Sequence, residues 1–148
     1  MTILAAIGEE QHAQNVVSVA YDLAETYGDT LIALHVMPKE EFNEHKQAIN
    51  STPGYTHLTI DQEESSAKEF SREVVDAALD GFDRERVEVR GRVGEPANKV
   101  LDEAEYVDPR FVVIGAKHRS PVGKALFGST AQKILLDSDT PVVTTTTQ

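Results

Sequence analysis

Short apolar runs alternate with longer segments of helical periodicity along this chain. The runs Ile3–Ile7 and Phe111–Ile114 are apolar at successive positions, as in strands that are covered on both faces of a sheet. Val87 and Val89 instead alternate with charged residues, which indicates an edge strand. The pattern predicts five strands, at about Thr2–Ile7, Thr30–Val36, Glu85–Arg92, Arg110–Ile114 and Pro141–Thr145.

The segments between these strands have the spacing of amphipathic helices. Gly28 is placed to end the first helix, and Pro96 suits the first turn of the third. Alternating strands and helices favour βαβ units, so we expect a single α/β domain with a parallel sheet and helices on both faces. The predicted helices run from about Glu10 to Tyr27, from Asp61 as N-cap to Gly81, from Pro96 onward, and from Ser129 to Asp137.

The stretch from Pro38 to Ile60 is too long for an ordinary connection between a strand and a helix. Four interpretations fit its many polar residues and its two prolines. It could form a lid over a ligand, a segment that binds a protein partner, a partly helical insertion near Glu40–Ala48, or a mobile loop.

The composition narrows the class of protein. A chain of 148 residues can bury an adequate core as one domain, and the absence of cysteine excludes disulfides and thiolate metal or redox sites. Since no apolar stretch approaches the roughly 20 residues that span a bilayer, we expect a soluble cytoplasmic protein without membrane insertion. The five histidines lack the spacing of a metalloenzyme motif, so no metal site is predicted.

The formal net charge is −11, from 25 acidic and 14 basic side chains. This excess argues against binding to nucleic acid or to an anionic membrane surface. Two interpretations of the acidity remain open. It fits a cytoplasm of very high salt, where screening removes the self-repulsion, and it equally fits an ordinary solvated acidic surface.

A basic loop follows the fourth predicted strand and runs from Gly115 to Gly128. The loop carries three cations, Lys117, Arg119 and Lys124. Gly128-Ser129-Thr130 then opens a helix, and the free N–H groups at a helix start attract anions. Glycine also lets the backbone approach a ligand closely. The local pattern therefore predicts a ligand that bears phosphate.

Several motifs together resemble the universal stress protein (UspA-like) family over essentially the whole chain. They are the order of strands and helices, the Gly94-Glu95-Pro96 turn, and Gly115-x-x-His118-x9-Gly128-Ser129. Nucleotide-binding members carry G-x-x-G-x9-G-[S/T] after the fourth strand. The resemblance implies a Rossmann-like fold of the adenine nucleotide alpha hydrolase type, with strand order 3-2-1-4-5 and a ligand pocket between the first and fourth strands.

The resemblance also implies a ligand, ATP or another adenine nucleotide such as AMP, with Mg²⁺ accompanying a triphosphate. Gly115 would lie near the ribose, Val36 against the base, and Gly128 near the phosphates, with Lys117 and Arg119 as electrostatic helpers. The site residues expected on this basis are Ile7, Gly8, Val36, Gly115, Lys117, His118, Arg119, Gly128, Ser129 and Thr130.

The chain departs from the family pattern at two positions. His118 replaces the second glycine of the motif, and Gly8 stands where nucleotide binders commonly carry an aspartate. His118 keeps a backbone N–H for a phosphate, and its protonation below about pH 6.5 would tighten such a contact; as the alternative it is a solvated loop residue. Glu9 and Glu10 either face the basic loop or point to water.

The function implied is that of a stress-response sensor or regulator, since no residue stands out as a general base for hydrolysis. Family resemblance and the β-branched run at 141–146 predict a homodimer paired through the last strand. Two alternatives stay open. One is a nucleotide-free dimeric module that binds a protein partner through residues 38–60, and the other is a slow ATPase. His35 is expected to cap its strand or to join a hydrogen bond in the core.

Overall fold

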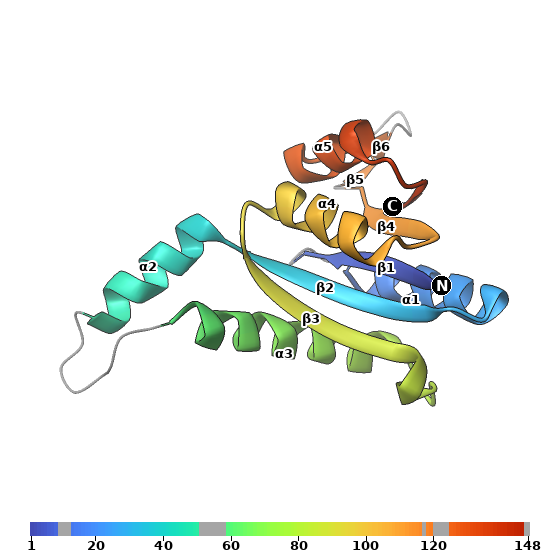
Figure 1. The fold of residues 1–148 in the computed structure, drawn as a ribbon, viewed down its shortest axis with the longest axis horizontal. Helices are drawn as coiled ribbons and strands as arrows, with labels where there is room; N and C mark the ends of the chain where they lie inside the picture. Colours follow the sequence, from blue (N-terminus) through green and yellow to red (C-terminus); the bar gives the residue numbers. More distant parts are fainter. Residues whose placement is uncertain (9–12, 51–58, 117, 120–124, 147–148) are drawn as a thin grey trace.

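The computed structural model describes residues 1–8, 13–50, 59–116, 118–119 and 125–146, which form a parallel sheet between two layers of helices (Figure 1). The strand order is β3-β2-β1-β4-β7, and every neighbouring pair is parallel. This confirms the predicted fold class and strand order. The strands are β1 (Thr2–Ile7), β2 (Thr30–Pro38), β3 (Val87–Gly94), β4 (Phe111–Gly115) and β7 (Val142–Thr145), with a short antiparallel pair β5 (His118–Arg119) and β6 (Ala125–Leu126).

Helices cover both faces of the sheet (Figure 1). Alternate residues of β1 explain why: Ile3 and Ala5 are buried against α1 and α3, while Leu4 is buried on the opposite face with residues of α4 and α5. The predicted two-sided burial of the strands is therefore confirmed. The helices are α1 (Ala13–Tyr27), α2 (Lys39–Asn50), α3 (Ile60–Ala78), α4 (Pro96–Val107) and α5 (Ser129–Asp137), and a single 3-10 turn, η1, spans Arg84–Arg86.

Helix α2 forms the first part of the long connection after β2. It begins directly where β2 ends and projects beyond the carboxyl ends of the strands (Figure 1). The helical alternative near Glu40–Ala48 is thus confirmed, while residues 51–58 lie outside the described part of the chain. The start of the first helix, predicted at Glu10, also lies outside it, whereas its end at Tyr27 and the stop at Gly28 are confirmed.

The prediction for α3 was wrong at both ends. Thr59, and not Asp61, is the N-cap: its hydroxyl accepts from Gln62 N at 3.1 Å, and Gln62 Oε1 accepts from Thr59 N at 3.0 Å. This reciprocal pair satisfies two N–H groups that an isolated aspartate would not. The helix ends at Ala78 because Leu79 adopts an extended conformation and packs against the core, so Gly81 lies outside it.

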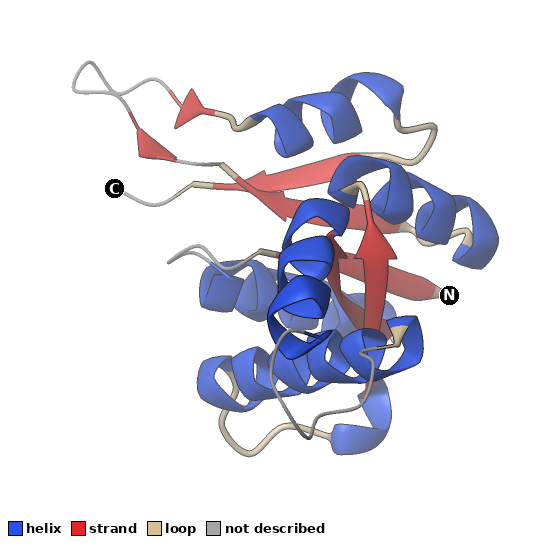
Figure 2. Ribbon diagram, turned by 90° about the vertical axis from the view of Figure 1, so that its left-hand side faces the viewer, coloured by secondary structure: helices blue, strands red, loops and turns tan. Residues whose placement is uncertain are grey.

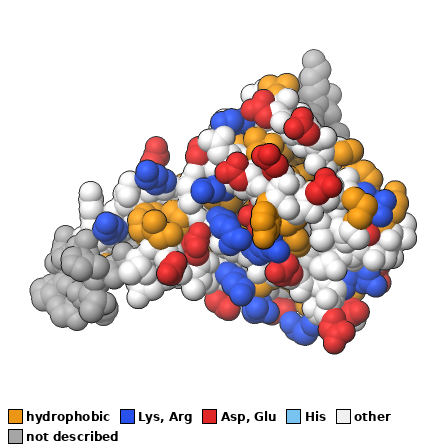
Figure 3. All heavy atoms as spheres, viewed as in Figure 1, with side chains coloured by type: hydrophobic (Ala, Val, Ile, Leu, Met, Phe, Trp, Pro, Cys, Tyr) orange, Lys and Arg blue, Asp and Glu red, His pale blue; other side chains and the backbone are white. Residues whose placement is uncertain are grey.

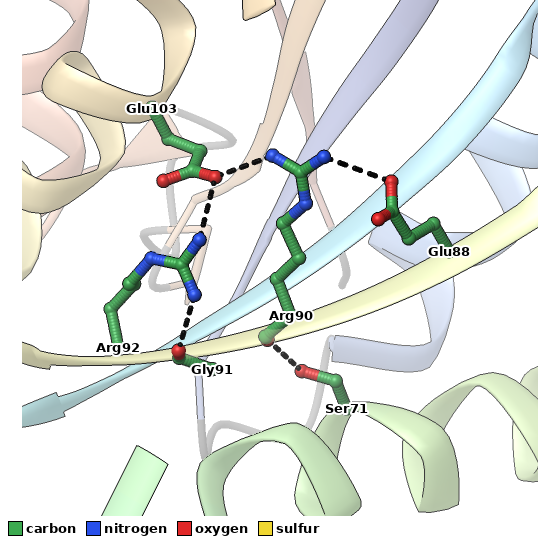
Figure 4. Close-up of polar contacts among 6 residues, drawn as sticks. All are labelled: Ser71, Glu88, Arg90, Gly91, Arg92 and Glu103. Carbon is green, nitrogen blue, oxygen red and sulfur yellow. Dashed lines mark hydrogen bonds and ion pairs between the residues drawn. The ribbon is translucent and has the colours of Figure 1, made fainter. Parts of the chain in front are cut away.

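The edge position predicted for β3 is confirmed, and side chains from both neighbouring layers hold the strand (Figure 4). Glu103 of α4 accepts from Arg90 at 2.6 Å and from Arg92 at 3.2 Å through the same oxygen. On the other face, Ser71 of α3 donates to the Arg90 carbonyl at 3.1 Å. Lys and Arg side chains gather along this strand, with acidic side chains among them (Figure 3).

The strand begins at Val87 instead of the predicted Glu85. The carboxylate of Asp83 accepts from Glu85 N at 3.0 Å and closes the 3-10 turn η1 just before it. No helix in the described segments is both long and apolar enough to cross a membrane.

Candidate functional site

A pocket of about 290 Å³ opens at the carboxyl ends of the central strands. Figure 2 looks onto these strand ends, with α2 in front of them. In an open parallel sheet, ligands bind at this edge where the strand order reverses, here between β1 and β4. The lining residues come from β1 and the residue after it (Ala6, Ile7, Gly8), β2 (Leu34, His35, Val36, Pro38), β4 (Ile114, Gly115), α2 (Glu41), α4 (Pro96, Val100) and α5 (Thr130, Ala131, Ile134).

The structure brings five of the residues named from the sequence to this pocket, and these are Ile7, Gly8, Val36, Gly115 and Thr130. Gly128 and Ser129 adjoin Thr130 at the start of α5 but are not part of the lining. His118 and Arg119 form β5, whose backbone pairs with β6. Lys117 lies outside the described residues, as do Glu9, Glu10 and Lys124.

The pocket also has lining residues that the sequence did not reveal. Val100, Ile114 and Ile134 are buried and make its walls apolar, although none of them was among the site residues expected from the sequence. Glu41 enters from the first turn of α2. A helix that starts immediately after β2 places its first turn at the ligand edge of the sheet, but without that helix Glu41 is one of many polar residues in a long connection.

His35 joins the ends of two strands that line the pocket. Its Nδ1 donates to the Ile7 carbonyl at 2.8 Å, and this assigns the proton to Nδ1 because a carbonyl can only accept. The ring also packs on Phe70, with 4.4 Å between centroids. The predicted hydrogen bond in the core is confirmed, so His35 shapes the pocket by fixing β1 against β2.

Two helix N-termini adjoin the pocket and differ in how they are capped. At α4, the carboxylate of Glu95 accepts from Ala97 N at 3.2 Å and from Asn98 N at 2.8 Å. At α5, the N-cap is Gly128, and no side chain of the described residues caps the helix. The N-terminus of α4 is thus already occupied by an anionic group, whereas that of α5 is available to an anionic ligand.

Among the described residues, the charged groups with clearly shifted pKa values lie away from this pocket. The pKa of Asp29, at the amino ends of the strands, is lowered because Arg110 donates a hydrogen bond to its carboxylate. The pKa of Arg90 on β3 is raised by hydrogen bonds to Glu103 and Glu88, which outweigh the effect of its burial. Both arrangements are structural ion pairs. Across the described ranges, no three acidic or histidine residues cluster as metal ligands.

Comparison with known proteins places this geometry in a family. The chain matches the universal stress protein family over residues 1–145. A universal stress protein of Mycolicibacterium smegmatis is 44% identical over 57 residues, a match that covers 38% of this chain and 44% of that relative, less than half its length.

Solved structures share the fold. The universal stress protein from Archaeoglobus fulgidus in complex with dAMP is similar, with TM-score 0.61 and 21% identity, and the match covers 97% of this chain and 96% of that one. A universal stress protein in complex with cAMP gives TM-score 0.64 and 17% identity, with 100% and 98% covered. At such identities the likeness shows the fold alone. With the family match over residues 1–145, however, the assignment is plain. This chain belongs to the universal stress protein family.

Proposed function

We propose that the protein binds an adenine nucleotide in the pocket at the carboxyl ends of β1, β2 and β4, and that it acts in the cytoplasm as a sensor or regulator of the stress response. One observation carries the proposal: an apolar cavity of about 290 Å³ adjoins the uncapped N-terminus of α5. A nucleotide has an apolar base and an anionic tail, and this pocket offers a matching surface to each.

The base is the part that the apolar walls fit. Leu34 and Val36 of β2, Val100 of α4 and Ile114 of β4 are all buried residues that line the cavity. Burial of apolar surface contributes roughly 25 cal/mol per Å², so a flat aromatic ring gains most where such side chains enclose it. Similar proteins that carry dAMP and cAMP support an adenine nucleotide as the ligand.

The phosphates would lie at the start of α5. Thr130 lines the pocket and Gly128 precedes it, so backbone N–H groups and the Ser129 and Thr130 hydroxyls are the donors in reach. Gly115 at the end of β4 would adjoin the ribose. Mg²⁺ would arrive with a triphosphate and be held largely by phosphate oxygens, which suits a site where the described residues supply no cluster of ligands.

The side chains that line the pocket favour nucleotide sensing over nucleotide hydrolysis. The two ionisable side chains among the described lining residues are His35 and Glu41. His35 uses Nδ1 to bind the Ile7 carbonyl, and Glu41 lies on the β2 side, away from α5. Phosphate release that persists through further purification and disappears in a Gly128 variant would instead support a slow ATPase.

The first experiment identifies the ligand that the protein carries. Freshly purified protein is denatured, and the released material is separated by chromatography and weighed by mass spectrometry. We expect an adenine nucleotide at up to one molecule per chain in the native protein and little in Gly128→Leu. Gln132→Leu is the matched control, because Gln132 is exposed one turn further along α5. If Gly128→Leu and Gln132→Leu release the same amount of nucleotide per chain, a phosphate site at Gly128 is contradicted.

We also propose a homodimer formed through residues 141–146. β7 is an outer strand of the sheet, and an unpaired edge invites association. The carbonyls of Pro141 and Thr145 accept from β4 and the residue after it, so the alternate residues Val142 and Thr144 direct their backbone groups away from the sheet. Antiparallel pairing of two such edges across a two-fold axis would continue the sheet.

Thr144→Pro tests this dimer because it removes an outward N–H while the bonds to β4 remain. Thr144→Val keeps the N–H and serves as the control. Light scattering at micromolar concentration should show a dimer for the native protein and Thr144→Val, and a monomer for Thr144→Pro. A native monomer would refute the dimer.

A further inference from the structure

Glu41 carries the only formal charge among the described residues that line the pocket, with histidine counted as neutral. It lies in the first turn of α2 and is half-buried. No hydrogen bond or ion pair joins its carboxylate to any residue that the structure describes, although His45 on the same helix pairs with Glu63 of α3 at 3.0 Å. The Glu41 carboxylate is therefore free to accept a hydrogen bond from a ligand in the pocket.

The position of Glu41 determines which part of a nucleotide it meets. The order β2-β1-β4 puts β2 two strand spacings from β4, about 10 Å. The phosphate donors lie on the β4 side, at α5 and Gly115, and Glu41 follows β2 on the opposite side. A nucleotide with its phosphates at α5 therefore directs its base toward Glu41. This orientation also keeps the carboxylate away from the phosphate charge.

The bases differ in what they offer to an ionised carboxylate, which can only accept hydrogen bonds. Adenine presents an amino group at position 6, which is a donor. Hypoxanthine presents a carbonyl oxygen there and carries its ring donor at N1. A carboxylate placed at position 6 therefore meets an acceptor, and the two acceptors repel one another while each loses its bond to water. At the end of β1, Gly8 contributes no side chain that could compensate.

We propose that Glu41 sets the base specificity of the pocket by accepting a hydrogen bond from the 6-amino group of adenine, an inference that rests on the nucleotide-binding function proposed above. The Glu41 carboxylate, on α2, thus determines which base the pocket prefers. A nucleotide whose carbonyl oxygen at position 6 faces the same carboxylate binds more weakly.

Competing titrations of ATP and ITP into nucleotide-free protein test this role. We expect the native protein to prefer ATP by on the order of 10- to 100-fold, the range for a hydrogen bond to a charged group. Glu41→Gln should shift the preference toward ITP, because an amide can turn its NH₂ toward the carbonyl oxygen. Glu41→Ala should bring the two affinities within about threefold of each other, since neither base then meets a polar group.

Glu40→Gln is the matched control, because Glu40 is exposed in the same turn of α2 and does not line the pocket. It removes the same charge and should keep the native ATP preference. Thermal melting of all variants checks that the fold is unchanged.

Two outcomes would overturn the inference separately from the proposed function. If the native protein binds ATP but Glu41→Gln and Glu41→Ala keep its ratio of ATP to ITP affinity, Glu41 does not read the base while nucleotide binding stands. Native protein that binds ATP and ITP equally well would also rule out this role for Glu41. If the native protein binds neither nucleotide, the proposed function and this inference fail together.

Discussion

Asp29 shows how a single residue fastens the end of the molecule opposite to the pocket. Its carboxylate is only 3% exposed, and it accepts from Arg110 Nε at 2.8 Å and lies 3.4 Å from the N-terminal ammonium. The hydrogen bond from Arg110 lowers the pKa of Asp29 below its ordinary value of 3.8. Arg110 also stacks over the Tyr27 ring at 4.3 Å, so one cluster links α1, β2 and β4.

A lowered pKa in the folded state makes this carboxylate stabilising above its unfolded pKa of 3.8, and the contribution is lost as the pH falls through the lower folded value. Asp29→Asn should therefore lower the free energy of unfolding at pH 7. Below about pH 4, the variant should lose less of this free energy than the native protein does as the pH falls. Urea unfolding at pH 7 and pH 3 measures both effects. Asp22→Asn, at an exposed position of α1, is the control. A variant with the native acid profile would contradict this role for Asp29.

The backbones of β3 and α3 approach one another closely at Gly91. A Cβ atom there would lie 2.3 Å from the Glu64 carbonyl oxygen and 2.4 Å from Lys68 N, both in the backbone of α3. Gly91→Ala should cost about 1–3 kcal/mol because the helix must move away. A Cβ atom at Gly128 meets no described atom within 4 Å, so Gly128→Ala should change stability little. Chemical denaturation compares the two, and equal effects would refute the close approach.

The sequence predicted part of the site at this scale. Gly115 and Thr130, which line the candidate pocket, could be named because glycine and hydroxyl residues at a strand end and a helix start have a local signature. Glu41 could not, since its place depends on the direction in which α2 leaves β2. The close approach at Gly91 could not be predicted either, because it involves Glu64 and Lys68 of α3, which lie more than 20 residues earlier in the chain.

At the scale of elements, α2 is the segment that completes the pocket. Among its described residues, Phe42 is buried, with 7% of its surface exposed, and His45 pairs with the buried Glu63 of α3. The helix extends past the sheet (Figure 1). The position of Glu41 therefore depends on the anchoring of α2.

Phe42→Ala should detach α2 while the sheet and the other helices stay folded, because the side chain lies outside both main core clusters. We expect faster hydrogen exchange of the amides in 39–50 and roughly tenfold weaker ATP binding, since Glu41 is displaced from the base. Glu44→Ala, at an exposed position on α2, is the control. Unchanged exchange in Phe42→Ala would show that another contact holds the helix.

Strands and amphipathic helices were predictable to within a few residues because their hydrophobic periods are local. The N-cap of α3 was misassigned because the capping box depends on Gln62 reaching back to Thr59, a pairing that competes with the acidic residue between them. The end of α3 was placed too late, since Leu79 leaves the helix to pack on the core and Gly81 has the positive φ of 58° only beyond it.

The charge of the whole molecule leads to a prediction about salt. With 25 acidic and 14 basic side chains, the compact state carries net self-repulsion that ions screen. We expect the thermal unfolding midpoint to rise between low and molar KCl. A large continuing rise in the molar range would favour adaptation to a high-salt cytoplasm, and a rise that levels off near roughly 0.2 M would favour an ordinary acidic surface. A fall in the midpoint would contradict net self-repulsion.

Binding of an adenine nucleotide in the pocket beside α5 is the proposal on which the others depend, and calorimetric titration of ATP into nucleotide-free protein at low and high KCl tests it without intermediate steps. We expect one ATP per chain, binding at least roughly tenfold weaker in Gly128→Leu, and native binding in Gln132→Leu. If ATP binds at neither salt concentration, the proposal is contradicted. A nucleotide-free module that contacts partners through the projecting α2 would then be the better description.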